Sequence, residues 1–195
     1  MSEIVLAAPL RIEAALIASA ARGASVRKTG MGPARAKAAV GTLERTQGGA
    51  LLVLGFCGGL DAQSVPGEVI IPQEVYAADD EGHEDRLIRC TLAGELVSHL
   101  AGRGLKLRSG RIVCVSRPAV GERRAALGAG GAIAVDMESV WLAAGAGERP
   151  FGVVRVVLDS PSHELLRLGA LPGALRAARA LRRVAAALHE WAPAV

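Results

Sequence analysis

A chain of 195 residues has the length of one ordinary domain, spanning residues 1–195, that can bury a core without disulfide or metal support. Hydrophobic residues make up 51% of the chain and aromatic residues 3%, and the apolar runs are shorter than a membrane span. The first residues lack the basic segment of a signal peptide, so we expect a cytoplasmic protein with no membrane partner. The net charge is +4, with basic residues concentrated at 103–124 and 167–183. Because aromatic residues for base stacking are almost absent, these segments favour solvated surfaces, and no nucleic-acid partner is expected.

The chain contains three cysteines, Cys57, Cys90 and Cys114, widely spaced among apolar neighbours. This spacing predicts reduced thiols in the core, and it fits neither a disulfide framework nor a zinc site. We therefore expect no metal and no cofactor.

The first quarter of the chain alternates between predicted strands and helices. An apolar strand over residues 4–8 precedes a segment, 10–21, whose apolar residues have helical spacing. A second strand over 24–29 leads through the turn Gly30-Met31-Gly32 into a helix over 33–45, with a proline at a favourable first position. Strand followed by helix, twice in succession, indicates an α/β fold.

The next apolar strand, 50–54, runs into a glycine-rich turn, Gly55-Phe56-Cys57-Gly58-Gly59. Paired glycines allow the backbone to approach a ligand closely. The spacing is not that of a dinucleotide-binding fingerprint, and the Gly-Lys-Ser/Thr of a phosphate-binding loop is missing, so neither of those sites is predicted.

The alternation continues to the end of the chain, with a predicted acidic turn at 79–85 that contains His83 and a loop at 161–164. Further strands are predicted at 67–71, 74–78, 86–90, 111–116, 132–135 and 151–158, and further helices at 92–103, 140–146 and 173–191. The last helix has a predicted core stripe of Leu175, Ala178, Leu181, Val184, Ala185 and Leu188. Near-continuous apolar strands imply a mostly parallel or mixed sheet covered on both faces, in a three-layer α/β/α domain.

Three acidic residues stand where two of these buried strands end. Asp136 and Glu138 follow the strand at 132–135, and Asp159 follows the strand at 151–158. In open α/β sheets, ligands bind beyond the carboxyl ends of the strands. Acids at these ends are therefore candidates for chemistry.

The segments that contain these acids resemble those of a known family. Val135-Asp136-Met137-Glu138-Ser139, followed by Val154-Arg155-Val156-Val157-Leu158-Asp159, is similar to the signature of the nucleoside phosphorylase and nucleosidase superfamily, most of all to methylthioadenosine/S-adenosylhomocysteine nucleosidases. The similarity extends through residues 29–32, 55–60 and 65–72 and covers nearly the whole chain. It implies a sandwich fold around a partly barrel-like sheet, cleavage of the glycosidic bond of a purine-type nucleoside, and a homodimer or larger homo-oligomer.

The resemblance assigns roles to the acids. Asp159 matches the acid that protonates or hydrogen-bonds the leaving purine, Glu138 matches the carboxylate that holds both ribose hydroxyls, and Met137 matches the apolar floor beneath the sugar. Without the resemblance, Asp159 reads equally well as a helix cap or a salt-bridge partner of Arg155. Glu138 and Asp136 could likewise be acids that stabilise a helix start.

The nucleophile is water in the nucleosidases and phosphate in the phosphorylases. Glu13 matches the water-activating glutamate of the nucleosidases, whereas Arg11, within Pro9-Leu10-Arg11, resembles a phosphate-binding arginine of the phosphorylases. The second arginine and the Ser/Thr of a phosphorylase phosphate site correspond to Val53 and Phe56 here. The sequence therefore favours water over phosphate.

The resemblance places further residues around the substrate and leaves its base open. The remaining pocket positions that it implies are Arg11, Met31, Phe56, Cys57, Gly58 and Ala119. Leu158 replaces a serine of the nucleosidases and Ala119 an aromatic platform, which could open the pocket to a bulky nucleoside such as futalosine or adenosylhopane. A nucleoside-binding protein without turnover is the alternative from another functional class.

Overall fold

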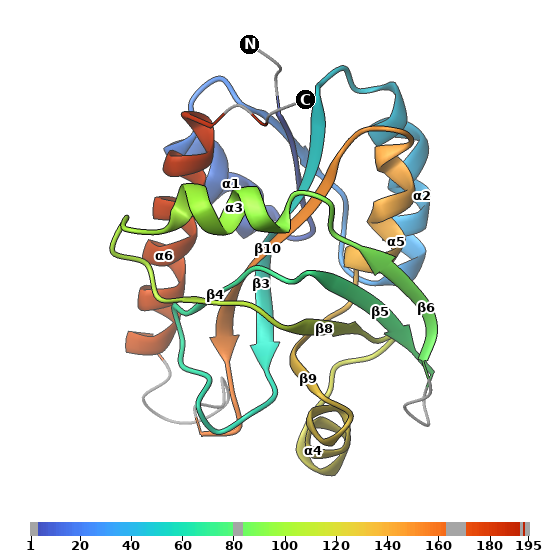
Figure 1. Ribbon diagram of the computed structural model, residues 1–195, viewed down its shortest axis with the longest axis vertical. Coiled ribbons are helices and arrows are strands. Elements are labelled where there is room, and N and C mark those ends of the chain that lie inside the picture. Colours follow the sequence, from blue (N-terminus) through green and yellow to red (C-terminus); the bar gives the residue numbers. More distant parts are fainter. Residues whose placement is uncertain (1–3, 80–83, 163–170, 192, 194–195) are drawn as a thin grey trace.

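Ten strands form one mixed sheet within the residues that the structure, a computed structural model, describes, namely 4–79, 84–162, 171–191 and 193 (Figure 1). His83 and the second half of the predicted 161–164 loop lie outside these residues. The strands are β1 (Ile4–Ala8), β2 (Ser25–Lys28), β3 (Ala50–Gly59), β4 (Val69–Ile70), β5 (Glu74–Ala78), β6 (Glu84–Arg89), β7 (Leu107–Arg108), β8 (Arg111–Cys114), β9 (Ala132–Asp136) and β10 (Phe151–Asp159).

Strand β3 organises the sheet because it has different neighbours along its length. Its first residues pair in parallel with β1, and β1 pairs in parallel with β2. Its last residues, Gly58 and Gly59, pair antiparallel with β9, while β10 runs parallel to it along the other edge. Beyond β9 follow β8, β5 and β6, and beyond β10 follow β4 and β7. Six of the nine strand pairs described are parallel, so the expected mixed, mostly parallel sheet is confirmed.

Helices cover both faces of this sheet, as Figure 1 shows. The helices are α1 (Arg11–Ala20), α2 (Pro33–Arg45), α3 (Ala93–Leu100), α4 (Gly121–Ala129), α5 (Ser139–Leu142), the 3₁₀ helix η1 (Ala143–Ala146) and α6 (Leu171–His189). Helices α1, α3 and α6 lie on one side of the sheet, and α2 and α5 lie on the other. Such coverage explains why every residue of β1 is buried, and why β3 and β10 are apolar along most of their length.

Several boundaries differ from the sequence prediction for identifiable reasons. The glycine-rich segment predicted as a turn continues β3 as far as Gly59, because β10 and β9 supply hydrogen-bonding partners on its two edges. Helix α4 and the short strand β7 were not predicted. In α6, Leu175 is 54% exposed and Ala178 only half-buried, whereas Ala177 and Ala180 face the core in their place.

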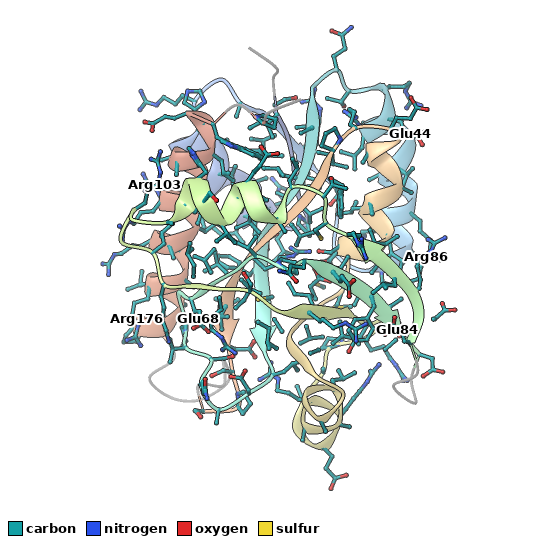
Figure 2. All side chains as sticks on the ribbon, viewed as in Figure 1. Glu44, Glu68, Glu84, Arg86, Arg103 and Arg176 are labelled. Carbon is teal, nitrogen blue, oxygen red and sulfur yellow. The ribbon has the colours of Figure 1, made fainter. Side chains whose placement is uncertain are left out.

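The basic segment at 103–124 is held largely by acids of the same chain. Arg103 pairs with Glu190 at 3.3 Å, and Lys106 pairs with Glu68 at 3.1 Å. Arg108 lies 2.7 Å from Asp61. Figure 2 shows charged side chains of both signs around the periphery, in agreement with a solvated charged surface.

The three cysteines are free and buried, as expected. Among the described residues, no helix has the length and hydropathy needed to cross a membrane.

Candidate active site

A cavity of about 270 Å³ opens where β1, β3, β8, β9 and β10 reach their carboxyl ends. All of the predicted site residues except Arg11 line it, namely Glu13, Met31, Phe56, Cys57, Gly58, Ala119, Met137, Glu138 and Asp159. Arg11 is exposed on α1 and lies outside the lining. Residues more than a hundred positions apart in the sequence therefore line one cavity. This cavity contains the three candidate carboxylates, Glu13, Glu138 and Asp159.

Glu13 is fixed at the cavity by two backbone donors. It occupies the third position of α1, and its Oε2 accepts a hydrogen bond of 2.6 Å from the Leu10 N–H at the start of that helix. Its Oε1 accepts a hydrogen bond of 2.6 Å from the Phe56 N–H in β3. A carboxylate has about four lone-pair sites, so each oxygen keeps one for a water molecule or a substrate. The side chain is 2% exposed and therefore has one defined orientation.

Glu138 lies two residues after the end of β9, and its side chain reaches across to the turn before α2. Its Oε1 accepts a hydrogen bond of 2.8 Å from the Gly32 N–H, and its Oε2 lies 3.4 Å from the Arg155 guanidinium. Gly32 has φ of +88°, a conformation that glycine adopts without strain, and this places its N–H toward the carboxylate. Although Glu138 precedes α5, its side chain does not cap that helix. Glu138 is therefore the N-cap residue of α5, but its carboxylate is held by Gly32 and Arg155 and not by the backbone of that helix.

Asp136 performs the helix-start role and also holds Arg155. Its Oδ1 accepts the Ser139 N–H at 3.4 Å at the beginning of α5. Its Oδ2 lies 2.6 Å from the Arg155 guanidinium, which is completely buried. The alternative that paired Arg155 with Asp159 is wrong, because Arg155 bridges Asp136 and Glu138 instead.

Burial has the largest influence on the pKa values of Glu138 and Glu13. It raises the pKa of Glu138 to about 7, against an opposing effect of Arg155, and nearby Asp136 adds to the increase. Burial also raises the pKa of Glu13, and Arg155 and the Phe56 and Leu10 N–H groups work in the opposite direction. Buried carboxylates of this kind are typical of functional sites.

The raised pKa of Glu138 predicts a pH-dependent stability effect of Glu138→Gln. Between its ordinary value of 4.5 and about 7, the folded state keeps a proton that the unfolded state has lost, so wild-type stability falls as pH rises. The variant does not titrate there. Its free energy of unfolding relative to wild type should therefore increase across this window, by about 3 kcal/mol at most.

Thermal melting at about pH 5 and about pH 8 measures this difference, at about 2–4 °C for each kcal/mol. Glu190→Gln, which removes an exposed carboxylate paired with Arg103, controls for the amide substitution. The melting temperature of the variant minus that of wild type should be larger at the higher pH. A smaller value at the higher pH would contradict the raised pKa of Glu138.

Asp159 ends β10 and forms an ion pair of 2.8 Å with Arg124 of α4. Both side chains line the cavity, and the Arg124 side chain is 9% exposed. The pair packs on Gly58, where a Cβ atom would lie 2.7 Å from Arg124 Nη2 and 3.1 Å from Asp159 Oδ1.

Gly55 has the same role beneath Glu13. A Cβ atom on Gly55 would lie 2.6 Å from Glu13 Oε1 and 2.9 Å from Arg155 Nη1. The sequence suggested that glycines here admit a ligand to the backbone. The structure shows that Gly55 and Gly58 also give room to the side chains of Glu13, Arg124 and Asp159.

Sequence reasoning missed two arginines that pair with the carboxylates of the site, Arg155 and Arg124. Arg155 gave a usable signal, because a charged residue within the apolar run of β10 must find a buried partner. Arg124 gave none, because one arginine in a short, glycine-rich basic segment looks like an exposed helix residue.

A larger hollow of about 670 Å³ lies between α3, β6 and the segment from η1 to Phe151. None of the predicted site residues lines it. Among the described residues, no cluster of His, Cys, Asp and Glu has the arrangement of a metal site.

Solved structures with this fold include nucleosidases. The chain is similar to the 5'-methylthioadenosine/S-adenosylhomocysteine nucleosidase of Campylobacter jejuni, with 13% identity and a TM-score of 0.78 over 98% of this chain and 100% of that chain. Futalosine hydrolase of Helicobacter pylori has 14% identity and a TM-score of 0.77, over 96% and 95% of the two chains. A nucleosidase from Colwellia psychrerythraea, solved with adenine, has 17% identity and a TM-score of 0.75 over 96% of each chain.

At these identities the structural likeness establishes the fold. No curated protein matches the chain in sequence. The sequence of residues 15–188, however, matches the family described as the phosphorylase superfamily. Since that match covers most of the 195 residues, the chain belongs to the phosphorylase superfamily.

Proposed function

We propose that this protein is an N-ribosyl hydrolase that cleaves a purine-type nucleoside into a free base and its ribose moiety. The observation that carries the proposal is that three carboxylates converge on one cavity: Glu13 from the first turn of α1, Glu138 from the segment after β9, and Asp159 from the end of β10. Each carboxylate has an anchored position and a different set of partners, which suits three different tasks.

The chemistry divides among these three groups. As the bond between the ribose C1' and the base nitrogen breaks, the electron pair leaves with the base and positive charge develops on the sugar. Asp159 delivers or shares the proton that neutralises the base, and Glu138 accepts hydrogen bonds from the vicinal hydroxyls. Glu13 takes a proton from the water whose oxygen bonds to C1'. Met137 contributes an apolar surface to the same cavity.

The charge distribution favours water over phosphate as the nucleophile. Arg11 is exposed and outside the cavity, and Val53, at the position of a second phosphate-binding arginine, is completely buried. Arg124 and Arg155 are each paired with carboxylates. A phosphate dianion would meet Glu13 and Glu138 without a free cation among the described lining residues, so the phosphorylase alternative is less favourable.

Release of free base from purine ribonucleosides, followed by liquid chromatography, tests the proposal. Nucleoside binding without base release would instead support a binding protein that lacks turnover.

The Glu138 assignment gives a sharper prediction. Glu138→Gln replaces a charged acceptor by a group with one acceptor oxygen, which should cost about 1.5–3 kcal/mol for a ribonucleoside. The preference for a ribonucleoside over its 2'-deoxy analogue should therefore fall in the variant. The ratio of kcat/KM for the two substrates is compared between the variant and wild type. Equal ratios would show that Glu138 does not bind the vicinal hydroxyls of the ribose.

We also expect a homodimer or larger assembly, as the family resemblance implies. The α5 residues Val140 and Leu142 are buried within the chain, and Lys37 Nζ lies 4.2 Å from the Trp141 ring centre. Exposed apolar side chains instead surround the cavity mouth, with Met31 at 47% and Val120 at 69% exposure. Analytical ultracentrifugation at micromolar concentration should give at least twice the 20.0 kDa of the chain. A monomer would remove this expectation.

A further inference from the structure

A further hollow, of about 320 Å³, lies between the flank of α2 and the strand β2, which pairs only with β1 in the described sheet. Its charged lining residues are Arg27, Lys28 and Arg35, and the rest of its described lining is uncharged. We call it the basic hollow. None of its lining residues lines the candidate active site, so the two cavities are separate. Its volume is in the range of pockets that bind small molecules.

The three cations of the basic hollow lack a compensating acid. No ion pair joins Arg27, Lys28 or Arg35 to a carboxylate among the residues that the structure describes. Arg103 and Arg108, by contrast, are each paired with an acid of the same chain. A concave surface lined by charges of one sign concentrates the electric field and attracts counter-ions. The basic hollow therefore favours an anionic ligand.

Arg35 has a further reason to favour an anion. It lies in the first turn of α2, which contains no acidic residue, and the helix dipole makes a cation unfavourable there. A bound anion would offset this interaction. The aliphatic part of the Arg35 side chain packs on Gly30, where a Cβ atom would lie 2.7 Å from Arg35 Cδ. This contact restricts the side chain on the side of the turn, although Arg35 is exposed.

The two arginines point toward opposite ends of the basic hollow and keep most of their donors. Arg35 donates one hydrogen bond of 3.4 Å to the carbonyl oxygen of Met31, which precedes α2. Arg27 donates one of 3.4 Å to the hydroxyl of Thr46, which follows the last residue of α2. A guanidinium has five N–H donors, so each group has donors left for a ligand. Such groups suit phosphate, which they bind through paired hydrogen bonds.

We propose that the basic hollow binds a small metabolite with a phosphate group toward each end, at a site separate from nucleoside cleavage. One phosphate would bind Arg35 and the other Arg27. The α2 residues that line the hollow run from Arg35 to Thr42, which corresponds to a length of roughly 10 Å along the helix. Ala38 and Ala39 lie between these ends, and their short side chains leave room for the carbon skeleton of the ligand.

Isothermal titration calorimetry at an ionic strength of about 0.15 M tests this site, because separated exposed charges are then largely screened. Fructose 1,6-bisphosphate is the bisphosphate probe and fructose 6-phosphate the monophosphate. Wild type should bind one bisphosphate per chain, about 10-fold or more tightly than the monophosphate, since one charged contact contributes about that factor. Arg27→Gln and Arg35→Gln should each remove this advantage. Arg45→Gln, at an exposed α2 residue outside the lining, should keep it.

An absence of binding, or equal affinity of wild type for the two probes, would overturn the proposal. It would also be overturned if both lining variants kept the advantage of the bisphosphate, or if Arg45→Gln lost it. The three arginines are exposed, so these substitutions leave the core intact. None of these results depends on nucleoside cleavage, and a failure of the proposed function would leave them unchanged.

Backbone amide chemical shifts of wild type locate the bound bisphosphate without any variant. The probe should shift the signals of Ala38, Ala39 and Thr42 in the basic hollow. The signals of Phe56 and Gly58, which line the candidate active site, should stay in place. Shifts confined to the active-site residues would show that the phosphate groups bind there, and would overturn the proposal.

Discussion

Glu13→Gln should lower kcat by about 10²- to 10⁴-fold, the contribution typical of a positioned general base. The carboxylate is 2% exposed and accepts hydrogen bonds from both the Leu10 and the Phe56 N–H groups. The amide of the variant has nearly the same volume, but it can accept from only one of these two donors. It could no longer accept a proton from water. Nucleoside affinity should change much less than turnover, because the variant loses the base but keeps Glu138 and Asp159.

Steady-state kinetics and binding of an uncleavable nucleoside analogue separate these two effects. Glu190→Gln makes the same chemical change at an exposed ion pair with Arg103, and should retain wild-type kcat. A Glu13→Gln enzyme with kcat within about threefold of wild type would exclude Glu13 as the base, given the magnitudes above.

Asp159→Asn should also reduce kcat by about 10²- to 10⁴-fold, for a different reason. The amide can still accept a hydrogen bond from Arg124, so the 2.8 Å contact has a replacement and the fold should persist. The variant cannot deliver a proton to the leaving base. Its loss should therefore be smallest for nucleosides whose base departs easily without protonation.

A series of purine nucleosides with increasingly acidic bases measures that dependence. Wild type should show a shallow dependence of kcat on the pKa of the base, and Asp159→Asn a steeper one. Asp61→Asn, which changes an aspartate paired with Arg108 at 2.7 Å outside the cavity, provides the matched control. Equal slopes in wild type and Asp159→Asn would show that Asp159 does not act as the acid.

The elements that build the site were predictable where local pattern and burial agree. The apolar runs that became β1, β3 and β10 are buried along most of their length, and β9 and β10 each end on an aspartate. A carboxylate at such an edge can be expected from the sequence alone. The position of Glu13 needed the family resemblance, because its contact with Phe56 joins two elements 43 residues apart.

The pairings inside the site could not be predicted because they depend on how distant segments meet. The Gly32 N–H reaches Glu138 across 106 residues, and Arg124 reaches Asp159 across 35. Helix α4 was missed because its nine residues include two glycines and bury only Arg124 and Leu127. Its place is determined by the tertiary contact with Asp159, which has no local signature.

The sugar product identifies the nucleophile and tests the central claim most directly. Inosine and adenosine, each incubated with the protein in the presence and absence of excess phosphate, would be followed by phosphorus NMR together with an assay for free ribose. With Glu13 in the cavity and Arg11 outside it, we predict free ribose under both conditions and no ribose 1-phosphate. Ribose 1-phosphate that forms only when phosphate is present would contradict the hydrolase and return Arg11 to the role of a phosphate ligand.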